Sequence, residues 1–285
     1  MTSLGEAVAD ARTRFDAAGL PNAAMEARIL IAGLLKLTST EVFANADRIL
    51  TDMEAAMIDD SVARRLKREP VHRILGAREF YGMTLTLSKE TLEPRPDTEI
   101  LIEILLPHLR RIASEKDRAR VLDLGTGTGA IALALLKGCA EAQAVGTDIS
   151  DDALRTAQEN AVREGVAERF EAIRSDWFTT IRGRFDIIVS NPPYIKQSAI
   201  AALEPEVRDF DPYRALNGGI DGLDAYRAIA TGAQAFLEKD GIVGVEIGFD
   251  QKDSVTGVFA ASGFALQQAA RDYGDNDRVL VFSAK

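Results

Sequence analysis

The sequence has a single cysteine, Cys139, and only two histidines, His72 and His108. One cysteine excludes an intramolecular disulfide and fits a reducing compartment, and two isolated histidines do not provide a zinc cluster. Long apolar runs are also missing: Ile29 to Leu35 is far shorter than the ~20 residues of a membrane-spanning helix. The segment from Met1 to Glu6 lacks the basic and apolar regions of a secretory signal. We therefore expect a cytoplasmic protein with no membrane partner.

Acidic residues outnumber basic ones: the sequence has 34 Lys and Arg and 44 Asp and Glu, which gives a formal net charge of −10. A general nucleic-acid binder presents a basic face to phosphates, so no direct nucleic-acid partner is expected. One dense basic cluster, Arg64-Arg65-Lys67-Arg68, fits either a solvated helix end or a contact for an acidic or RNA-associated partner. The 285 residues are 46% hydrophobic and 27% charged, which indicates a soluble globular chain of one large or two unequal domains. We expect it to be a monomer.

Residues 1–70 are predicted to form a small bundle of four or five helices. Apolar residues recur there at helical spacing. Thr38 with Glu41, and Thr51 with Glu54, have the spacing of capping boxes and indicate helix starts.

Residues 71–97 are predicted to form a β-hairpin connector and a linker. The stretch from Glu79 to Leu87 alternates in polarity around a glycine, which is typical of a hairpin. Pro94 and Pro96 then stiffen a loop, and Asp97 is the expected N-cap of the next helix.

Residues 98–285 alternate strands with helices, which predicts an α/β domain with a doubly wound, mostly parallel, seven-stranded sheet. Only residues 271–277 separate the last two strands, too few for a parallel crossover, so this pair is expected to be antiparallel. The predicted strands are 120–124, 142–147, 169–174, 185–190, 241–247, 264–270 and 278–283.

A glycine-rich loop follows the first of these strands and consists of Gly125, Thr126, Gly127, Thr128 and Gly129. Its glycines allow the backbone to approach a ligand closely, and the N–H groups at the following helix start can donate to that ligand. Asp148 ends the second strand, 23 residues after Gly125, where it can accept both hydroxyls of a ribose. Strand, loop, helix and delayed acid together predict a nucleoside site.

The loop also fits a dinucleotide-binding fingerprint, Gly125-x-Gly127-x-x-Ala130. Two features favour another cofactor: Asp123 is placed to hold the ammonium of a methionine moiety, and Gly129 follows Gly127 by two residues. This arrangement resembles the S-adenosylmethionine loop of class I methyltransferases. Asp176 and Trp177, after the third strand, offer an acid and an aromatic ring for adenine, with core packing as the alternative for Trp177.

The four residues Asn191-Pro192-Pro193-Tyr194 follow the fourth strand. They can form a rigid lip that accepts two hydrogen bonds from a planar NH2 group, although Asn-Pro also marks ordinary turns. In a doubly wound sheet this lip should face the glycine loop across one crevice. Asn191 Oδ1 and the Pro192 carbonyl would then hold the acceptor nitrogen beside the cofactor, which Asn191 would also contact. Pro193 would stiffen the lip and Tyr194 would pack on the amide plane.

The sequence resembles the HemK (PrmC) family of protein-(glutamine-N5) methyltransferases, which act on peptide chain release factors. The Asn-Pro-Pro-Tyr element is shared with DNA and RNA amino-methyltransferases, whereas the segments 94–99 and 271–276 are more particular to this family. Glu93 departs from the pattern, since members more often carry an apolar residue there. The resemblance runs nearly end to end through Glu69-Pro70, Gly76–Phe80, Pro94–Glu99, Asp123–Gly129, Ser175–Phe178, Asn191–Tyr194 and Arg271–Arg278.

This resemblance implies a class I methyltransferase fold, S-adenosylmethionine as cofactor and a glutamine in the release factor's Gly-Gly-Gln loop as acceptor. It assigns the glycine loop, Asp148 and Trp177 to the cofactor, the lip to the glutamine, and the helical domain to the partner. Three alternatives remain: a ribosomal-protein glutamine methyltransferase, a nucleic-acid amino-methyltransferase, and a cofactor-sensing partner protein without turnover. Arg95 could reach the site or form a structural salt bridge.

Overall fold

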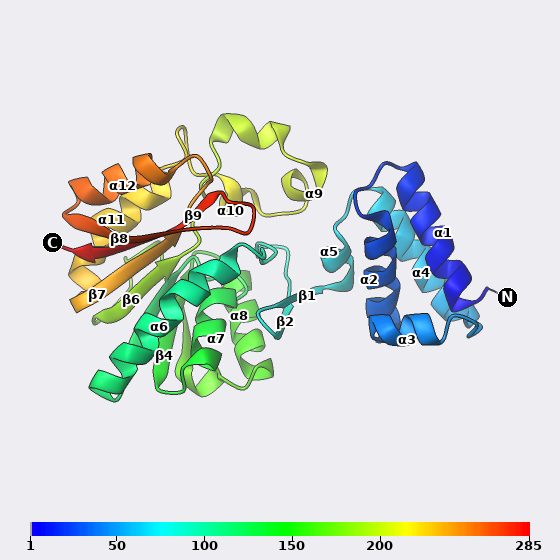
Figure 1. The fold of residues 1–285 in the computed structure, drawn as a ribbon, viewed down its shortest axis with the longest axis horizontal. Coiled ribbons are helices and arrows are strands. Elements are labelled where there is room, and N and C mark those ends of the chain that lie inside the picture. Colours follow the sequence, from blue (N-terminus) through cyan, green and yellow to red (C-terminus); the bar gives the residue numbers. More distant parts are fainter. Residues whose placement is uncertain (1) are drawn as a thin grey trace. The chain divides into compact units, whose positions relative to one another are not determined.

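The computed structural model describes residues 2–285, which form two compact units (Figure 1). Unit 1 comprises Met1–Ala77 and Glu204–Phe210, and unit 2 comprises Arg78–Leu203 and Asp211–Lys285. A short internal segment of the chain therefore belongs to unit 1, although unit 2 precedes and follows it. The division at residues 70 and 97 predicted from the sequence stays a proposal about separately folding parts.

Unit 1 is helical, as predicted from the N-terminal sequence. Thr38 and Thr51 each form the expected capping box, with their side chains accepting from the backbone of Glu41 and Glu54. The core consists of apolar side chains that the helices turn inward, with Phe15 and Leu30 fully buried. The helices are α1 (Leu4–Ala17), α2 (Ala23–Leu35), α3 (Ser39–Ala44), α4 (Asp52–Leu66), α5 (Val71–Leu75) and the short α9 (Pro205–Arg208).

In the basic cluster at the end of α4, Arg65 and Arg68 form ion pairs inside unit 1. Arg65 is only 1% exposed, and its guanidinium donates to Glu26 at 2.7 Å and to Glu206 at 2.9 Å. Arg68 lies 2.8 Å from the Glu206 carboxylate and 3.2 Å from that of Glu204. The expectation of a solvated helix end is therefore wrong for Arg65, because burying a guanidinium requires paired carboxylates. These ion pairs hold segment 204–210 on the helices.

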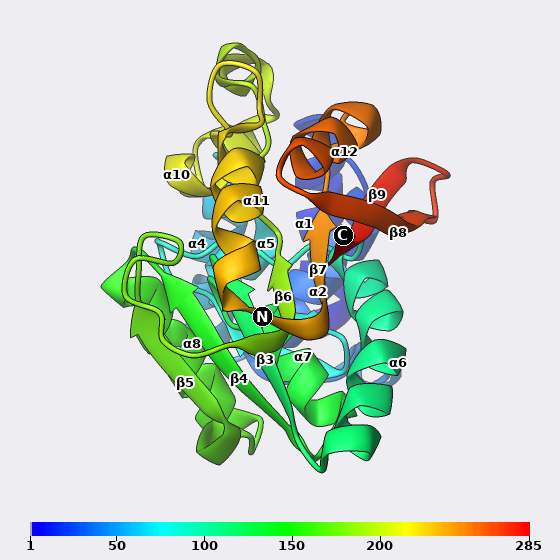
Figure 2. The same cartoon turned by 90° about the vertical axis from the view of Figure 1, so that its left-hand side faces the viewer.

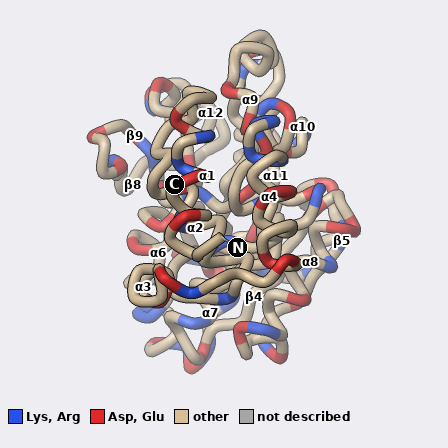
Figure 3. The backbone as a smooth tube through the Cα atoms, turned by 90° about the vertical axis from the view of Figure 1, so that its right-hand side faces the viewer, with Lys and Arg blue, Asp and Glu red and all other residues tan. Residues whose placement is uncertain are grey.

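Charged residues of both signs lie among one another on unit 1. In Figure 3, Lys and Arg are interspersed with Asp and Glu along its helices. Arg14 of α1 pairs with Asp59 of α4 at 3.0 Å, and Arg12 lies 3.5 Å from Asp16, but such exposed pairs contribute little to stability. Among the described residues, no helix combines the length and apolar character needed to cross a bilayer.

The predicted hairpin is present as a two-stranded sheet of β1 (Ala77–Phe80) and β2 (Met83–Thr86). Tyr81 and Gly82 form its turn with φ of +48° and +69°. Positive φ at both central residues is what a two-residue type I′ turn requires.

Unit 2 is built on a seven-stranded sheet with the order β5-β4-β3-β6-β7-β9-β8. Strand β9 is antiparallel to β7 and β8, and the other neighbours are parallel. This confirms the predicted fold class and the antiparallel last pair. The strands are β3 (Ala119–Leu124), β4 (Ala142–Asp148), β5 (Phe170–Arg174), β6 (Phe185–Ser190), β7 (Leu237–Glu246), β8 (Phe264–Arg271) and β9 (Asp277–Ala284).

Helices cover both faces of this sheet (Figure 2). Successive strand residues point to opposite faces, so Val121 packs in the core under one helix layer and Leu122 in the core under the other. The first layer holds α6 (Thr98–Lys116), α7 (Ala130–Gly138) and α8 (Asp151–Arg163), and the second holds α11 (Asp224–Phe236) and α12 (Lys252–Ala261). With both faces covered, the carboxyl ends of the strands are where a ligand crevice is expected.

Candidate active site

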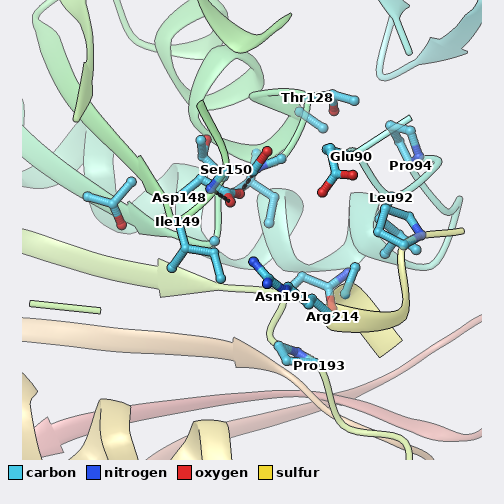
Figure 4. Close-up of a pocket in the computed structure, with 18 of the residues that line it drawn as sticks. Glu90, Leu92, Pro94, Thr128, Asp148, Ile149, Ser150, Asn191, Pro193 and Arg214 are labelled. Carbon is cyan, nitrogen blue, oxygen red and sulfur yellow. Dashed lines mark hydrogen bonds between the residues drawn. The ribbon is translucent and has the colours of Figure 1, made fainter. Parts of the chain in front are cut away.

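A cavity of about 210 Å³ in unit 2 lies beyond the carboxyl ends of β3, β4 and β6 (Figure 4). The strand order reverses between β3 and β6, which is the usual ligand position in such a sheet. The predicted residues that line the cavity are Gly125, Thr126, Gly127, Thr128, Asp148, Asp176, Trp177, Asn191 and Pro193. The predicted residues that are not among those lining the cavity are Asp123, Gly129, Pro192 and Tyr194.

Two glycines of the loop have different roles. Gly127 has a φ of +55° and borders the cavity, and a Cβ built there meets no atom within 4 Å. A side chain at Gly127 would therefore project into open space that a ligand can occupy. Gly129 is the N-cap of α7 with a φ of +84°, and its Cβ would lie 3.0 Å from Leu133 and 3.3 Å from Ala157. Gly129 thus permits the turn and close packing, and Gly127 permits close approach of a ligand.

Asp123 lies beneath the glycine loop and is 1% exposed. Its Oδ2 accepts from Thr126 Oγ1 at 2.7 Å and from the Ala132 backbone N–H at 3.3 Å. Burial raises the pKa of the Asp123 carboxyl to about 7. In this geometry Asp123 holds Thr126, which lines the cavity; direct contact with a methionine ammonium stays a prediction.

Asp148 joins the end of β4 to the glycine loop. Its Oδ2 accepts from the Gly127 backbone N–H at 3.1 Å, and its Oδ1 accepts from the Ser150 backbone N–H at 3.0 Å (Figure 4). These bonds fix the carboxylate at the cavity wall, and burial raises its pKa. A carboxylate so held has acceptor capacity left for two neighbouring hydroxyls.

Asp176 and Trp177 follow β5 and line the cavity together. Trp177 has a φ of +48°, which is rare for a bulky side chain and is typical of strained functional positions. The indole is partly buried and also packs on the core under α11 and α12. Trp177 therefore both lines the cavity and packs on the core, and its contact with an adenine ring stays a prediction.

Asn191 presents its side-chain amide to the cavity in one orientation. Its Nδ2 donates to Thr98 Oγ1 at 3.1 Å, and Thr98 Oγ1 donates to Glu246 Oε2 at 2.6 Å. Because Nδ2 is engaged with Thr98, Oδ1 is the Asn191 atom left to accept from a ligand. Thr98 and Glu246 are buried, and no local pattern in the sequence marks either of them as a site residue.

The other residues of the lip, Pro192 to Tyr194, are held by burial and by a backbone hydrogen bond. Pro192 is buried, and the Tyr194 carbonyl accepts from Gln251 Nε2 at 3.1 Å. Burial, with the nearby Glu246 carboxyl, raises the pKa of the Tyr194 phenol to about 12. The phenol is therefore neutral at physiological pH and is no general base. Packing of Tyr194 on an amide plane stays a prediction.

The linker before α6 forms another wall of the cavity. Arg95 lines it and also pairs with Asp211 at 2.5 Å, so it is both a wall residue and half of a salt bridge. The unusual Glu93 is buried and pairs with Arg78, which explains how a carboxyl fits there. Lining residues that were not predicted from the sequence include Glu90, Leu92, Pro94, Thr98, Ile149, Ser150 and, from α10 (Tyr213–Leu216), Arg214.

The segment Arg271–Arg278 forms the turn between β8 and β9 and supports the start of α6. Asp272 accepts from the backbone of Asn276 at 3.0 Å and from Arg278 Nη2 at 2.8 Å, and these bonds lower its pKa to about 2. Arg278 also lies 3.3 Å from the Asp97 carboxylate. The prediction that Asp97 caps α6 is wrong for its side chain, which makes no capping hydrogen bond because it faces Arg278.

We expect the free energy of unfolding to fall as the pH rises toward 7, because of Glu246. Burial raises the pKa of this carboxyl from 4.5 to about 7, so the folded protein holds the proton more tightly than the unfolded chain does. The resulting stabilisation is full below pH 4.5, is lost as the pH rises through about 7, and changes by about 2 kcal/mol between pH 5.5 and 8. Urea unfolding should show a smaller pH dependence for Glu246→Gln; equal dependence in both proteins would contradict the assignment.

Two models of known protein families match the chain. Residues 6–76 match the PrmC N-terminal domain, and residues 97–204 match the Methyltransferase small domain. A protein of Agrobacterium fabrum (strain C58) named Release factor glutamine methyltransferase is 57% identical over 272 residues, covering 95% of this chain and 94% of that protein. The protein of the same name from Rhodospirillum rubrum is 42% identical over 268 residues, which cover 94% of this chain and 81% of that protein.

Solved structures show the same architecture. A ribosomal protein L11 methylase from Lactobacillus delbrueckii subsp. bulgaricus has a TM-score of 0.51 and 20% identity, covering 68% of this chain and 82% of that one. A methyltransferase from Pyrococcus furiosus has a TM-score of 0.53 and 18% identity, covering 79% and 98%. At these identities the likeness establishes the class I methyltransferase fold alone.

Proposed function

Because the chain belongs to the family of release factor glutamine methyltransferases, we propose that it methylates the Gly-Gly-Gln glutamine of peptide chain release factors. The methyl group would pass from S-adenosylmethionine to the side-chain amide nitrogen, N5. The observation that carries the proposal is one cavity lined by both the Gly125–Gly129 loop and Asn191. A cofactor-binding end and an amide-binding end thus share one site.

The residues present fit S-adenosylmethionine. The open space beside Gly127 suits a ligand that runs along the backbone, and the fixed carboxylate of Asp148 suits the two ribose hydroxyls. Asp176 and Trp177 offer an acceptor and an aromatic face for adenine. When bound, S-adenosylmethionine supplies a methyl group on a sulfonium sulfur, which keeps the electrons of the broken S–C bond.

The lip is suited to an amide nitrogen, a poor nucleophile because its lone pair is delocalised into the carbonyl. Asn191 Oδ1 and the Pro192 carbonyl would accept its two hydrogens, which holds the nitrogen still and favours pyramidalisation. Alignment and preorganised dipoles supply the rate enhancement. Once alkylated, the nitrogen is strongly acidic and releases one proton to solvent, so the neutral phenol of Tyr194 need not act as a base.

The same proposal includes the protein partner, the cellular compartment and the oligomeric state. The enzyme would meet release factors in the cytoplasm, act as a monomer and use its helical residues 1–70 to hold the partner. A direct nucleic-acid substrate is disfavoured by the formal net charge of −10. Strong, salt-dependent binding of duplex DNA or RNA would contradict this part of the proposal.

The proposed function is tested by offering methyl-labelled cofactor and purified release factor to the enzyme. We expect label on the release factor and none on a variant whose Gly-Gly-Gln glutamine is replaced by alanine. Equal labelling of both proteins, or of neither, would overturn the assignment.

A further inference from the structure

We propose that Thr98 and Glu246 are positioning residues, which hold the side-chain amide of Asn191 with its oxygen toward the methyl acceptor. This inference rests on the proposed function and deepens it, because it says how the acceptor lip is kept in its productive form. Neither residue touches the reacting atoms in the proposed mechanism.

The three side chains come from three separate elements and meet in a line. Glu246 ends β7, Thr98 begins α6, and Asn191 follows β6. The Glu246–Thr98 hydrogen bond is 2.6 Å long and the Thr98–Asn191 hydrogen bond is 3.1 Å. Glu246 is 1% exposed and Thr98 is 4% exposed, so solvent does not compete for these bonds.

The available protons set the direction of the hydrogen bonds that link Glu246, Thr98 and Asn191. A threonine hydroxyl has a single proton, and above about pH 7, where the Glu246 carboxyl is ionised and can only accept, Thr98 donates that proton to Glu246 Oε2. Thr98 Oγ1 can therefore only accept from Asn191, so it selects the NH2 end of the amide and turns Oδ1 away. Glu246 also interacts with the Asn191 side chain, so removing Thr98 weakens the hold on the amide without abolishing it. A flipped amide would turn its NH2 group toward the NH2 group of the substrate. A flipped Asn191 would lose the acceptor that the lip needs.

Removing the Glu246 carboxyl from water costs free energy, and polar groups around it offset this cost. A buried carboxyl needs polar partners, and besides Thr98 the Glu246 carboxyl has the Asn191 side chain and Arg278 nearby, of which Arg278 is held by Asp272. The Glu246 backbone carbonyl accepts from Tyr226 Oη at 2.9 Å, so the end of β7 is also held from the other helix layer. The carboxyl therefore provides Thr98 with a fixed acceptor.

The first test compares Thr98→Val, which removes the hydroxyl, with Thr98→Ser, which keeps it. We expect kcat for release-factor methylation to fall about tenfold in Thr98→Val, to recover in Thr98→Ser, and the cofactor Kd to stay unchanged in both. Thr256→Val in α12 is a matched control, because the Thr256 hydroxyl has no hydrogen-bond partner among the described residues. Full turnover in Thr98→Val, or equal losses in all three variants, would overturn the proposal.

A double-mutant cycle distinguishes positioning from a general structural role. If Thr98 acts through Asn191, adding Thr98→Val to Asn191→Ala should lower the residual turnover no further. A further tenfold loss in the double variant would show that Thr98 acts independently of Asn191 and would contradict the proposal.

A measurement without turnover keeps this inference separate from the proposed function. The side-chain NH2 signals of Asn191, assigned by their absence in Asn191→Asp, should exchange slowly with solvent in the wild type and at least tenfold faster in Thr98→Val. Equal exchange in both proteins would refute the positioning role. If the wild-type enzyme labels no release factor, the proposed function fails, and this exchange comparison still decides whether Thr98 holds Asn191.

Discussion

Replacement of Asn191 by alanine is expected to lower kcat by about 10²–10³-fold, the usual cost of losing one oriented polar group that acts in the transition state. Asn191 Oδ1 is the side-chain acceptor at the cavity, and its orientation is fixed through Thr98. Alanine leaves the acceptor nitrogen without this hydrogen bond, so the lone pair is no longer aligned with the methyl group. The measurement is single-turnover methylation of release factor at saturating cofactor.

The affinity for cofactor is the control for this substitution. Asn191→Ala should bind S-adenosylmethionine with a Kd within about twofold of wild type by calorimetry, because the loop and Asp148 are unchanged. Retained turnover would refute the role of Asn191. Loss of cofactor binding in parallel with turnover would show that Asn191 serves the cofactor more than the acceptor.

Replacement of Asp148 by alanine is expected to weaken cofactor binding, with a Kd for S-adenosylmethionine that is higher by about a hundredfold or more. A carboxylate that accepts from two hydroxyls loses two charge-assisted bonds, and each such bond is worth roughly 1.5–3 kcal/mol. Burial raises the pKa of Asp148, so wild type and variant are compared at the same alkaline pH, which favours the ionised carboxylate. Calorimetry gives the Kd directly.

Neighbouring acids provide matched controls for Asp148. Asp151, at the start of α8, is exposed and pairs with the exposed Arg174 at 3.0 Å. Asp151→Ala should leave the cofactor Kd unchanged, and Asp148→Asn, which keeps one acceptor oxygen, should fall between wild type and Asp148→Ala. Unchanged affinity in Asp148→Ala would contradict the assignment of the ribose to this carboxyl.

The fold was predictable because its signals are local. Apolar runs mark strands that are buried on both faces, and capping boxes mark the starts of α3 and α4. The antiparallel pairing of β8 and β9 follows from the few residues between them, since a short turn cannot make a crossover. The glycine loop and the lip were likewise predictable as strand-end segments, and strand order brings them to one cavity.

The supporting contacts were not predictable, because they join residues that are distant in sequence. Thr98 and Glu246 are 148 positions apart, and neither follows a motif that indicates its partner. Asp97 has the sequence position of a cap, but the guanidinium of Arg278 attracts its side chain away from the helix end. Arg65 looked like a solvated cation, because the segment that supplies Glu206 lies 141 positions later.

The most direct measurement is tandem mass spectrometry of the Gly-Gly-Gln peptide from release factor incubated with the enzyme and S-adenosylmethionine. We predict one added methyl group on the side-chain amide of the glutamine, absent when Asn191→Ala replaces the wild-type enzyme over the same time. A methyl group on any other residue of the release factor, or an unmodified glutamine after full reaction, would contradict the proposed function.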